Sequence, residues 1–190
     1  MVDMDLIGLF DRATAWTASK IAAADGQREA ATPCDEWNVA RLLDHLLDGQ
    51  AIFAAGAAGA VVGPPIGDPP RLAGNDPAAQ YETARQATIA SYSRPGVLAG
   101  TVNTPVGPMP AAQFLGIGVC DQLIHGWDLA RGTHQDATMP PELAAAAWQM
   151  LGGRISDDNR GPGKIFKMPV PVPEDASVQA KLLAYTGRQP

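Results

Sequence analysis

The sequence lacks most features that mark membrane or nucleic-acid-binding proteins. No stretch of about 18 uncharged apolar residues occurs, so no membrane-spanning helix is expected. The longest run that is both apolar and charge-free, around 51–65, is rich in Gly, Ala and Pro and too weakly apolar to insert. The formal net charge is -6, and Lys and Arg form no cluster. We therefore expect neither a nucleic-acid interface nor binding to an anionic membrane surface.

Cysteine and aromatic residues are also scarce. The two cysteines, Cys34 and Cys120, are far apart and form no CxxC motif, which argues against a zinc ribbon or a redox pair. The N-terminal residues lack the basic segment of a signal peptide, so we expect a cytoplasmic location with reduced thiols. Aromatics make up 6% of the chain, but 46% of its 190 residues are hydrophobic. That content is sufficient for the core of one domain.

Apolar residues recur at helical spacing along most of the chain. The spacing predicts four long helices, a fifth shorter helix and a short terminal helix, over 5–24, 39–59, 77–93, 111–131, 140–152 and 175–187. Asn38 stands where the cap of the second helix is expected. We therefore predict an all-α bundle of four long helices. It forms a single domain over 1–190, with a C-terminal extension over about 153–190.

Two segments between the predicted helices do not fit a helix. Pro64, Pro65, Pro69 and Pro70 exclude regular structure between the second and third helices, because proline fixes φ and removes a hydrogen-bond donor. The segment 97–110 alternates weakly and predicts an irregular hairpin or an extended loop. The bundle is thus expected to carry an irregular insertion.

The stretch DQLIHGWDLA, residues 121–130, places Asp121 and His125 four residues apart, on one face of the predicted fourth helix. With three His and 20 acidic residues in the chain, such spacing arises by chance with a probability of about one third. Phe114 and Ile117 lead directly into the pair on the same stripe, which places it on the core side. A buried carboxylate is costly unless it is paired or bound to a metal.

A third residue of the same kind lies on another helix. His45 falls on the inward stripe of the predicted second helix, between Leu42 and Leu46. His45, Asp121 and His125 together form a set of two imidazoles and one carboxylate. Such a set leaves coordination positions open, as catalytic metal sites require. The alternative is a metal-free core in which Asp121 is a hydrogen-bond partner of one histidine.

The remaining candidates carry weaker signals. Cys120 is expected to pack as a small apolar residue, and Cys34 has no basic neighbour in the sequence to lower its pKa. Asp128 is either an acceptor for the imidazole of His125 or a surface or capping residue. We expect core positions for Trp37, Trp127 and Trp148, an exposed loop position for His134, and either solvent or an anionic substrate beside Arg41 and Arg131.

Three separated blocks of the sequence resemble a known family: TPCDEWNVARLLDHLLDGQ, VCDQLIHGWDLARGT and VPEDASVQAKLLAYTGRQP. They are similar to the DinB-like superfamily, and specifically to actinobacterial proteins that share the metal-binding domain of mycothiol-dependent maleylpyruvate isomerase. The resemblance implies a DinB-like four-helix bundle that holds a divalent metal near one end. The ligands are a His of the second helix and an acid-x-x-x-His pair of the fourth, which are His45, Asp121 and His125 in this sequence.

The resemblance also implies thiol chemistry. The expected cofactors are zinc, with nickel or iron as alternatives, and a low-molecular-weight thiol such as mycothiol. The expected activity is a metal-dependent S-transferase or isomerase that acts on an electrophile, in a chain that is a possible homodimer.

This sequence departs from the isomerase in two ways. The isomerase has Glu at the position of Asp121, and it carries an additional C-terminal domain for which the segment after about Gly152 is too short. Maleylpyruvate isomerisation is therefore not carried over, and no catalytic residue is assigned. A non-catalytic metal-binding helical protein with a stress-related or interaction role is the alternative.

Overall fold

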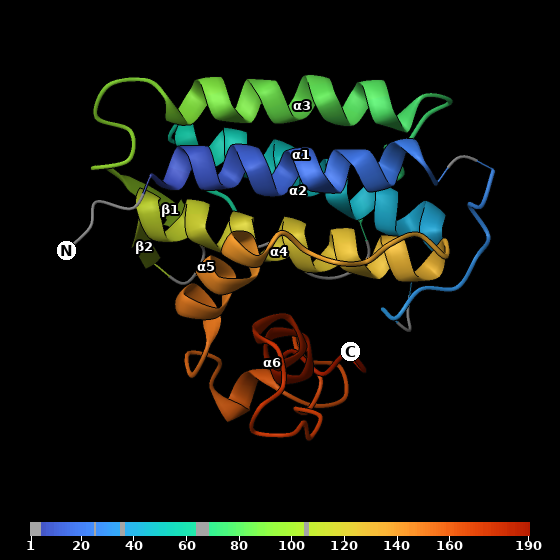
Figure 1. The fold of residues 1–190 in the computed structure, drawn as a ribbon. Helices are drawn as coiled ribbons and strands as arrows, with labels where there is room; N and C mark the ends of the chain where they lie inside the picture. The colour runs from blue at the N-terminus through green and yellow to red at the C-terminus, as the bar shows by residue number, and fades with distance from the viewer. Residues whose placement is uncertain (1–4, 25, 35–36, 64–68, 105–106) are drawn as a thin grey trace. The chain divides into compact units, whose positions relative to one another are not determined.

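The regular structure is mostly helical, with one small antiparallel hairpin (Figure 1). The computed structural model describes residues 5–24, 26–34, 37–63, 69–104 and 107–190. The helices are α1 Leu6–Ala22, α2 Val39–Ala57, α3 Pro77–Tyr92, α4 Ala111–Gly132, α5 Pro141–Leu151 and α6 Val178–Tyr185. Among the described residues, none of these helices is long and apolar enough to cross a membrane. The predicted all-α, DinB-like class is confirmed.

The chain divides into two compact units, and the first, Met1–Ala137, contains the four long helices. In this unit α1 and α2 each pack against both α3 and α4, so the two helices that are consecutive in sequence lie diagonally opposite. Helix α1 runs parallel to α4: Thr17 donates a hydrogen bond to the carbonyl of Gln122 (2.9 Å). A Cβ on Gly126 would lie 2.5 Å from Oγ1 of Thr17, so glycine is needed for this close approach.

Helices α2 and α3 also run parallel, and their connection is anchored at both ends. The carboxylate of Asp44 in α2 accepts hydrogen bonds from the amides of Leu72 and Ala73, both 2.7 Å, just before α3. At the other end, Arg94 donates to the carbonyl of Ala57, the last residue of α2 (2.9 Å). Because these two helices are parallel, the chain must run back along their length between the end of α2 and the start of α3. The part of this connection that contains Pro64 and Pro65 lies outside the described residues.

Side-chain caps explain where three of the bundle helices begin. The side chain of Asn38 accepts from the amide of Arg41 (3.1 Å), which confirms the predicted cap of α2. Asp5 and Asp76 cap α1 and α3 in the same way. Pro77 follows its cap directly, at a position where a missing N–H costs nothing.

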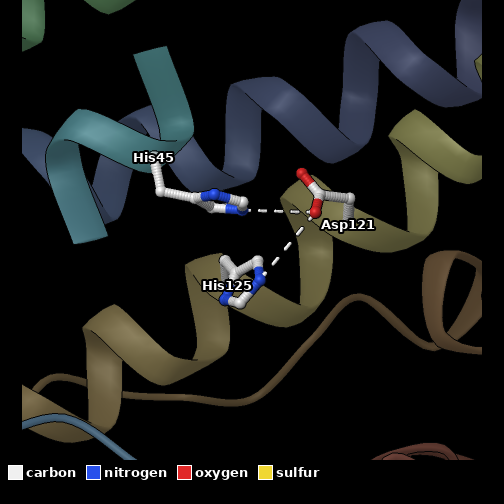
Figure 2. A group of neighbouring side chains, drawn as sticks. All are labelled: His45, Asp121 and His125. Atoms are coloured by element: carbon white, nitrogen blue, oxygen red, sulfur yellow. Dashed lines mark hydrogen bonds and ion pairs between the residues drawn. The ribbon is translucent and has the colours of Figure 1, made fainter. Parts of the chain in front are cut away.

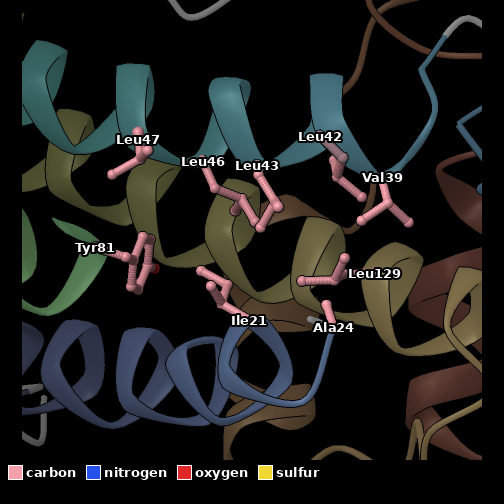
Figure 3. Close-up of a cluster of buried hydrophobic side chains, with 9 residues drawn as sticks. All are labelled: Ile21, Ala24, Val39, Leu42, Leu43, Leu46, Leu47, Tyr81 and Leu129. Atoms are coloured by element: carbon pink, nitrogen blue, oxygen red, sulfur yellow. The ribbon is translucent and has the colours of Figure 1, made fainter. Parts of the chain in front are cut away.

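One apolar cluster is built mainly by α2 (Figure 3). Its members are all buried: Ile21, Ala24, Val39, Leu42, Leu43, Leu46, Leu47, Tyr81 and Leu129. The α2 residues recur three and four positions apart, as one face of a helix requires. Burying each leucine contributes on the order of 2 kcal/mol.

The segment between α3 and α4 forms a hairpin, one of the two conformations that the sequence predicted. Strand β1, Thr101–Thr104, pairs antiparallel with β2, Gly107–Pro110. Val102 is buried against the end of α2, where a Cβ on Gly56 would lie 3.1 Å from its methyl carbon. The hairpin thus covers one end of the apolar interior of the bundle.

The second compact unit, Thr138–Pro190, packs α5 against α6 around Tyr185. The indole of Trp148 lies edge-on to this ring, with centroids 5.6 Å apart. The guanidinium of Arg160 lies 4.4 Å from the ring centroid and donates to the carbonyl of the same tyrosine (2.7 Å). Because α5 packs with α6, the compact C-terminal unit begins before α5, whereas the extension was expected from about residue 153.

Candidate metal centre

His45, Asp121 and His125 meet between α2 and α4 (Figure 2). These helices are antiparallel neighbours, so position 45 of one lies beside positions 121–125 of the other. Oδ1 of Asp121 lies 3.3 Å from Nε2 of His45 and 3.8 Å from Nε2 of His125. A single carboxylate oxygen therefore faces both imidazoles, and the short side chain of Asp121 reaches them.

The spacing of these three groups fits one metal ion. Their ligand atoms all lie within 4.8 Å of one another, and no other such group of His, Cys, Asp or Glu occurs among the described residues. Ligand atoms on one tetrahedral zinc ion lie about 3.4 Å apart, given bond lengths of about 2.0–2.1 Å. Two imidazoles and one carboxylate also suit nickel or iron.

The three side chains differ in exposure. The side chain of His45 is 2% exposed, whereas those of Asp121 and His125 are 14% and 13% exposed. The α4 side of the group is therefore the side that a small molecule can reach.

The pKa shifts at the site favour the metal-binding forms. Burial lowers the pKa of His125, and the neighbouring His45 lowers it further, against the opposing effect of Asp128. Burial alone would raise the pKa of Asp121. The nearby His45, which also hydrogen-bonds the carboxylate, brings this pKa below its ordinary value, with help from His125 and Gln122. A neutral imidazole and an ionised carboxylate are the forms that coordinate metals.

Asp128 orients the imidazole of His125. Its Oδ2 lies 2.9 Å from Nδ1 of His125, and its side chain is fully buried. An ionised carboxylate only accepts hydrogen bonds, so Nδ1 must donate and Nε2 keeps its lone pair toward Asp121. Of the two predicted roles for Asp128, the acceptor role is confirmed and the surface role is wrong.

Trp37 lies against the site as well as against the core. Its ring centroid lies 4.5 Å from that of His45 and 5.7 Å from that of His125. The indole is partly buried and packs against the apolar cluster, in agreement with the predicted core position. Trp127 is buried, also as predicted. The contact of Trp37 with both imidazoles was not predicted; it arises because Trp37 directly precedes the cap of α2.

A buried amide next to the site has no counterpart in the sequence-based predictions. Nε2 of Gln122 donates to Oδ2 of Asp121 (3.0 Å). Oε1 of Gln122 accepts from the hydroxyl of Tyr81 (2.6 Å) and from Nε2 of Gln50 (3.1 Å). Gln50, Tyr81 and Gln122 are all fully buried. The only sign of this network in the sequence is a glutamine, Gln50 or Gln122, on the apolar face of each of two predicted helices.

The other candidates lie away from the three ligands or are engaged elsewhere. Cys120 is buried, and burial raises its pKa to about 12, with Asp121 adding to the effect. Arg41 pairs with Asp44 (2.9 Å) and donates to the carbonyl of Pro69. The remaining predicted residues are placed as follows: Cys34 is half-buried, Arg131 lies 5.6 Å from the ring centroid of Trp127, and His134 is exposed.

Comparison with known families bears on this site. The family described as the mycothiol maleylpyruvate isomerase N-terminal domain matches residues 10–130, which is more than half of the chain. The chain belongs to this family. The match includes all three residues of the candidate site, but it ends before the third block that carried the resemblance, VPEDASVQAKLLAYTGRQP.

Two relatives come from Mycobacterium tuberculosis: Uncharacterized protein MT0763 of strain CDC 1551 / Oshkosh and Uncharacterized protein Rv0738 of strain ATCC 25618 / H37Rv. The chain is 32% identical to each over 157 residues, which cover 83% of this chain and 82% of the relative. No solved structure matches the chain significantly. Family membership therefore indicates a mycothiol-related, metal-binding type of function without a specific reaction.

Proposed function

We propose that this protein binds a divalent metal ion, zinc in the first place, and uses it with a low-molecular-weight thiol such as mycothiol in S-transfer or isomerisation. The observation that carries the proposal is the position of Oδ1 of Asp121, which faces Nε2 of His45 and of His125 from two different helices. This arrangement lies within the family match. Nickel or iron are alternatives that the same donors accept.

The residues of the chain supply ligands, orientation and shelter. His45, Asp121 and His125 hold the ion, and Asp128 keeps Nε2 of His125 unprotonated. Trp37 covers one side of both imidazoles and excludes water there. Three protein ligands leave a position for an exogenous thiol, as in catalytic rather than structural zinc sites.

The chemistry of the proposal depends on the acidity of the thiol. Zinc, when bound, would lower the pKa of a coordinated thiol so that a thiolate is present at neutral pH. The thiol and its electrophilic partner would enter from the α4 side, where Asp121 and His125 are partly exposed. No side chain of the site is needed as a general base in this scheme.

The first test is metal content. Purified wild-type protein, loaded with zinc and dialysed, should retain about one ion per chain, because the three ligands form one site. His45→Ala should retain less than about a tenth of that. His134→Ala is the matched control, because this third histidine is exposed and is not one of the three ligands. Wild-type protein without stoichiometric metal, or His45→Ala with unchanged content, would contradict the proposal.

The second test separates an enzyme from a metal-binding protein without catalysis. The zinc-loaded protein should accelerate the loss of monochlorobimane in the presence of mycothiol, and His45→Ala should not. Other low-molecular-weight thiols, assayed in parallel, identify which thiol is used. A zinc-replete protein that accelerates none of these reactions would favour a non-catalytic role instead.

A further inference from the structure

The two oxygens of Asp121 have different partners. Oδ1 faces the imidazoles, whereas Oδ2 accepts a hydrogen bond from Nε2 of Gln122 (3.0 Å). This second oxygen lies on the side of the buried amide network, away from the ligand atoms. The two halves of one carboxylate thus belong to two separate sets of contacts.

The orientation of the Gln122 amide is determined by its surroundings. Two donors, the hydroxyl of Tyr81 and Nε2 of Gln50, surround its Oε1. Two acceptors, Oδ2 of Asp121 and the carbonyl of Leu46 (3.5 Å), surround its Nε2. If the amide were turned over, its Nε2 would face the donor Nε2 of Gln50, and its Oε1 would face two acceptors, Oδ2 of Asp121 and the carbonyl of Leu46. All of this is buried, so water cannot replace a lost partner.

Gly49 provides the space in which this amide lies. Gly49 is one turn after His45 on α2, and a Cβ there would lie 2.7 Å from Nε2 of Gln122 and 3.5 Å from Oδ2 of Asp121. A real Cβ essentially never comes that close to another heavy atom. One face of α2 thus supplies a ligand at position 45 and, at position 49, the space that the amide of Gln122 occupies.

We propose that Gln122 is a positioning residue that reserves Oδ2 of Asp121, so that this carboxylate offers the metal a single oxygen, Oδ1. A carboxylate that bound through both oxygens would fill one more coordination position and leave less room for a thiol. The inference rests on the proposed metal site and adds how that site keeps a position open. Gly49 is part of the same device.

The test compares three variants. Gln122→Met keeps the length of the side chain but removes the donor to Oδ2. Gly49→Ala displaces the amide while adding a better helix former. Tyr81→Phe is the matched control: it removes one of the two donors to Oε1 of Gln122, while Gln50, the carbonyl of Leu46 and Asp121 still hold the amide in the same orientation. Zinc affinity is measured by competition with a chromophoric chelator, and the number of Co²⁺ ligands by the intensity of the visible absorption bands.

Gln122→Met and Gly49→Ala should each lose about 10–100-fold in zinc affinity, the range typical of groups that orient metal ligands. Their Co²⁺ bands should be weaker than those of wild type, because a freed Oδ2 adds a ligand. Tyr81→Phe should stay within about threefold of wild type. The thermal unfolding temperatures of the metal-free variants should not rank in the same order as their zinc affinities, since Gly49→Ala favours the helix.

Each other outcome has a defined meaning. Variants at 49 and 122 that bind zinc as wild type does, with the same Co²⁺ spectrum, would overturn the inference and leave the metal site intact. An equal loss in Tyr81→Phe would also overturn it, because the integrity of the whole network would then be the cause. A wild-type protein that binds neither ion would overturn the proposed metal site itself.

Discussion

Helix α2 contributes to two neighbouring regions that differ in almost every respect. The apolar cluster takes Leu42, Leu43 and Leu46 from it, with no polar contact among their side chains. The candidate metal centre and its amide network take His45 and Gln50 from the same turns. The first region gains stability from burial alone, whereas the second needs each polar group to have its partner.

Tyr81 joins these two regions. Its ring belongs to the apolar cluster, and its hydroxyl donates to Gln122 in the network. Stability and ligand binding therefore depend on different residues of one helix. Changes in the cluster should therefore unfold the protein, and changes in the polar region should alter binding while the fold persists.

The largest expected effect on stability is in the apolar cluster. Leu42→Ala should lower the free energy of unfolding by about 2–5 kcal/mol, because it leaves a cavity at a fully buried position. Urea denaturation of the metal-free protein measures this change. Leu72→Ala is the control, since Leu72 is 39% exposed and should change stability by less than about 0.5 kcal/mol. A loss below about 1 kcal/mol for Leu42→Ala would show that the apolar cluster is not what stabilises this part of the fold.

An intermediate effect is expected at the partner of His125. Asp128→Asn should weaken zinc binding by about 10–100-fold, because an amide orients the imidazole less strictly than a carboxylate does. The control is Asp48→Asn, which removes a half-buried charge near His45. Among the described contacts, Asp48 makes no hydrogen bond to either imidazole. Equal losses in both variants would show that overall charge, rather than the contact at Nδ1, is responsible.

The smallest effect concerns Cys120, which is next to Asp121 in sequence but packs in the interior. Burial raises its pKa to about 12, so at pH 8 the thiol is protonated in the folded protein and should not react with Ellman's reagent. In a Cys34→Ser background, labelling should occur only after denaturation. Rapid labelling of the native variant would place Cys120 with the exposed side of the site instead.

Much of the fold follows from local pattern. Helical spacing and the cap at Asn38 predict α2 closely, because burial of one helix face and a side-chain cap are properties of neighbouring residues. The pairing of α1 with α4 and of α2 with α3, parallel in both cases, was not predicted. It depends on contacts between distant segments, such as Asp44 with Leu72, which no local spacing reveals.

The candidate site divides in the same way. His45, Asp121 and His125 could be singled out as polar residues on apolar stripes, and family resemblance supported their grouping. Gln122 and the space at Gly49 could not, because a glutamine in a core has no meaning until its partners on other helices are known. Nor does the sequence show that Trp37, besides packing against the core, lies against two imidazoles.

The position of Trp37 has an optical consequence. An indole 4.5 Å from one imidazole and 5.7 Å from another is close enough for its excited state to be quenched by either ring when protonated. The fluorescence of this side chain is therefore coupled to the charge of the histidine pair. The fluorescence of Trp37 should therefore report, without any label, the protonation of these two rings or the binding of an ion to them.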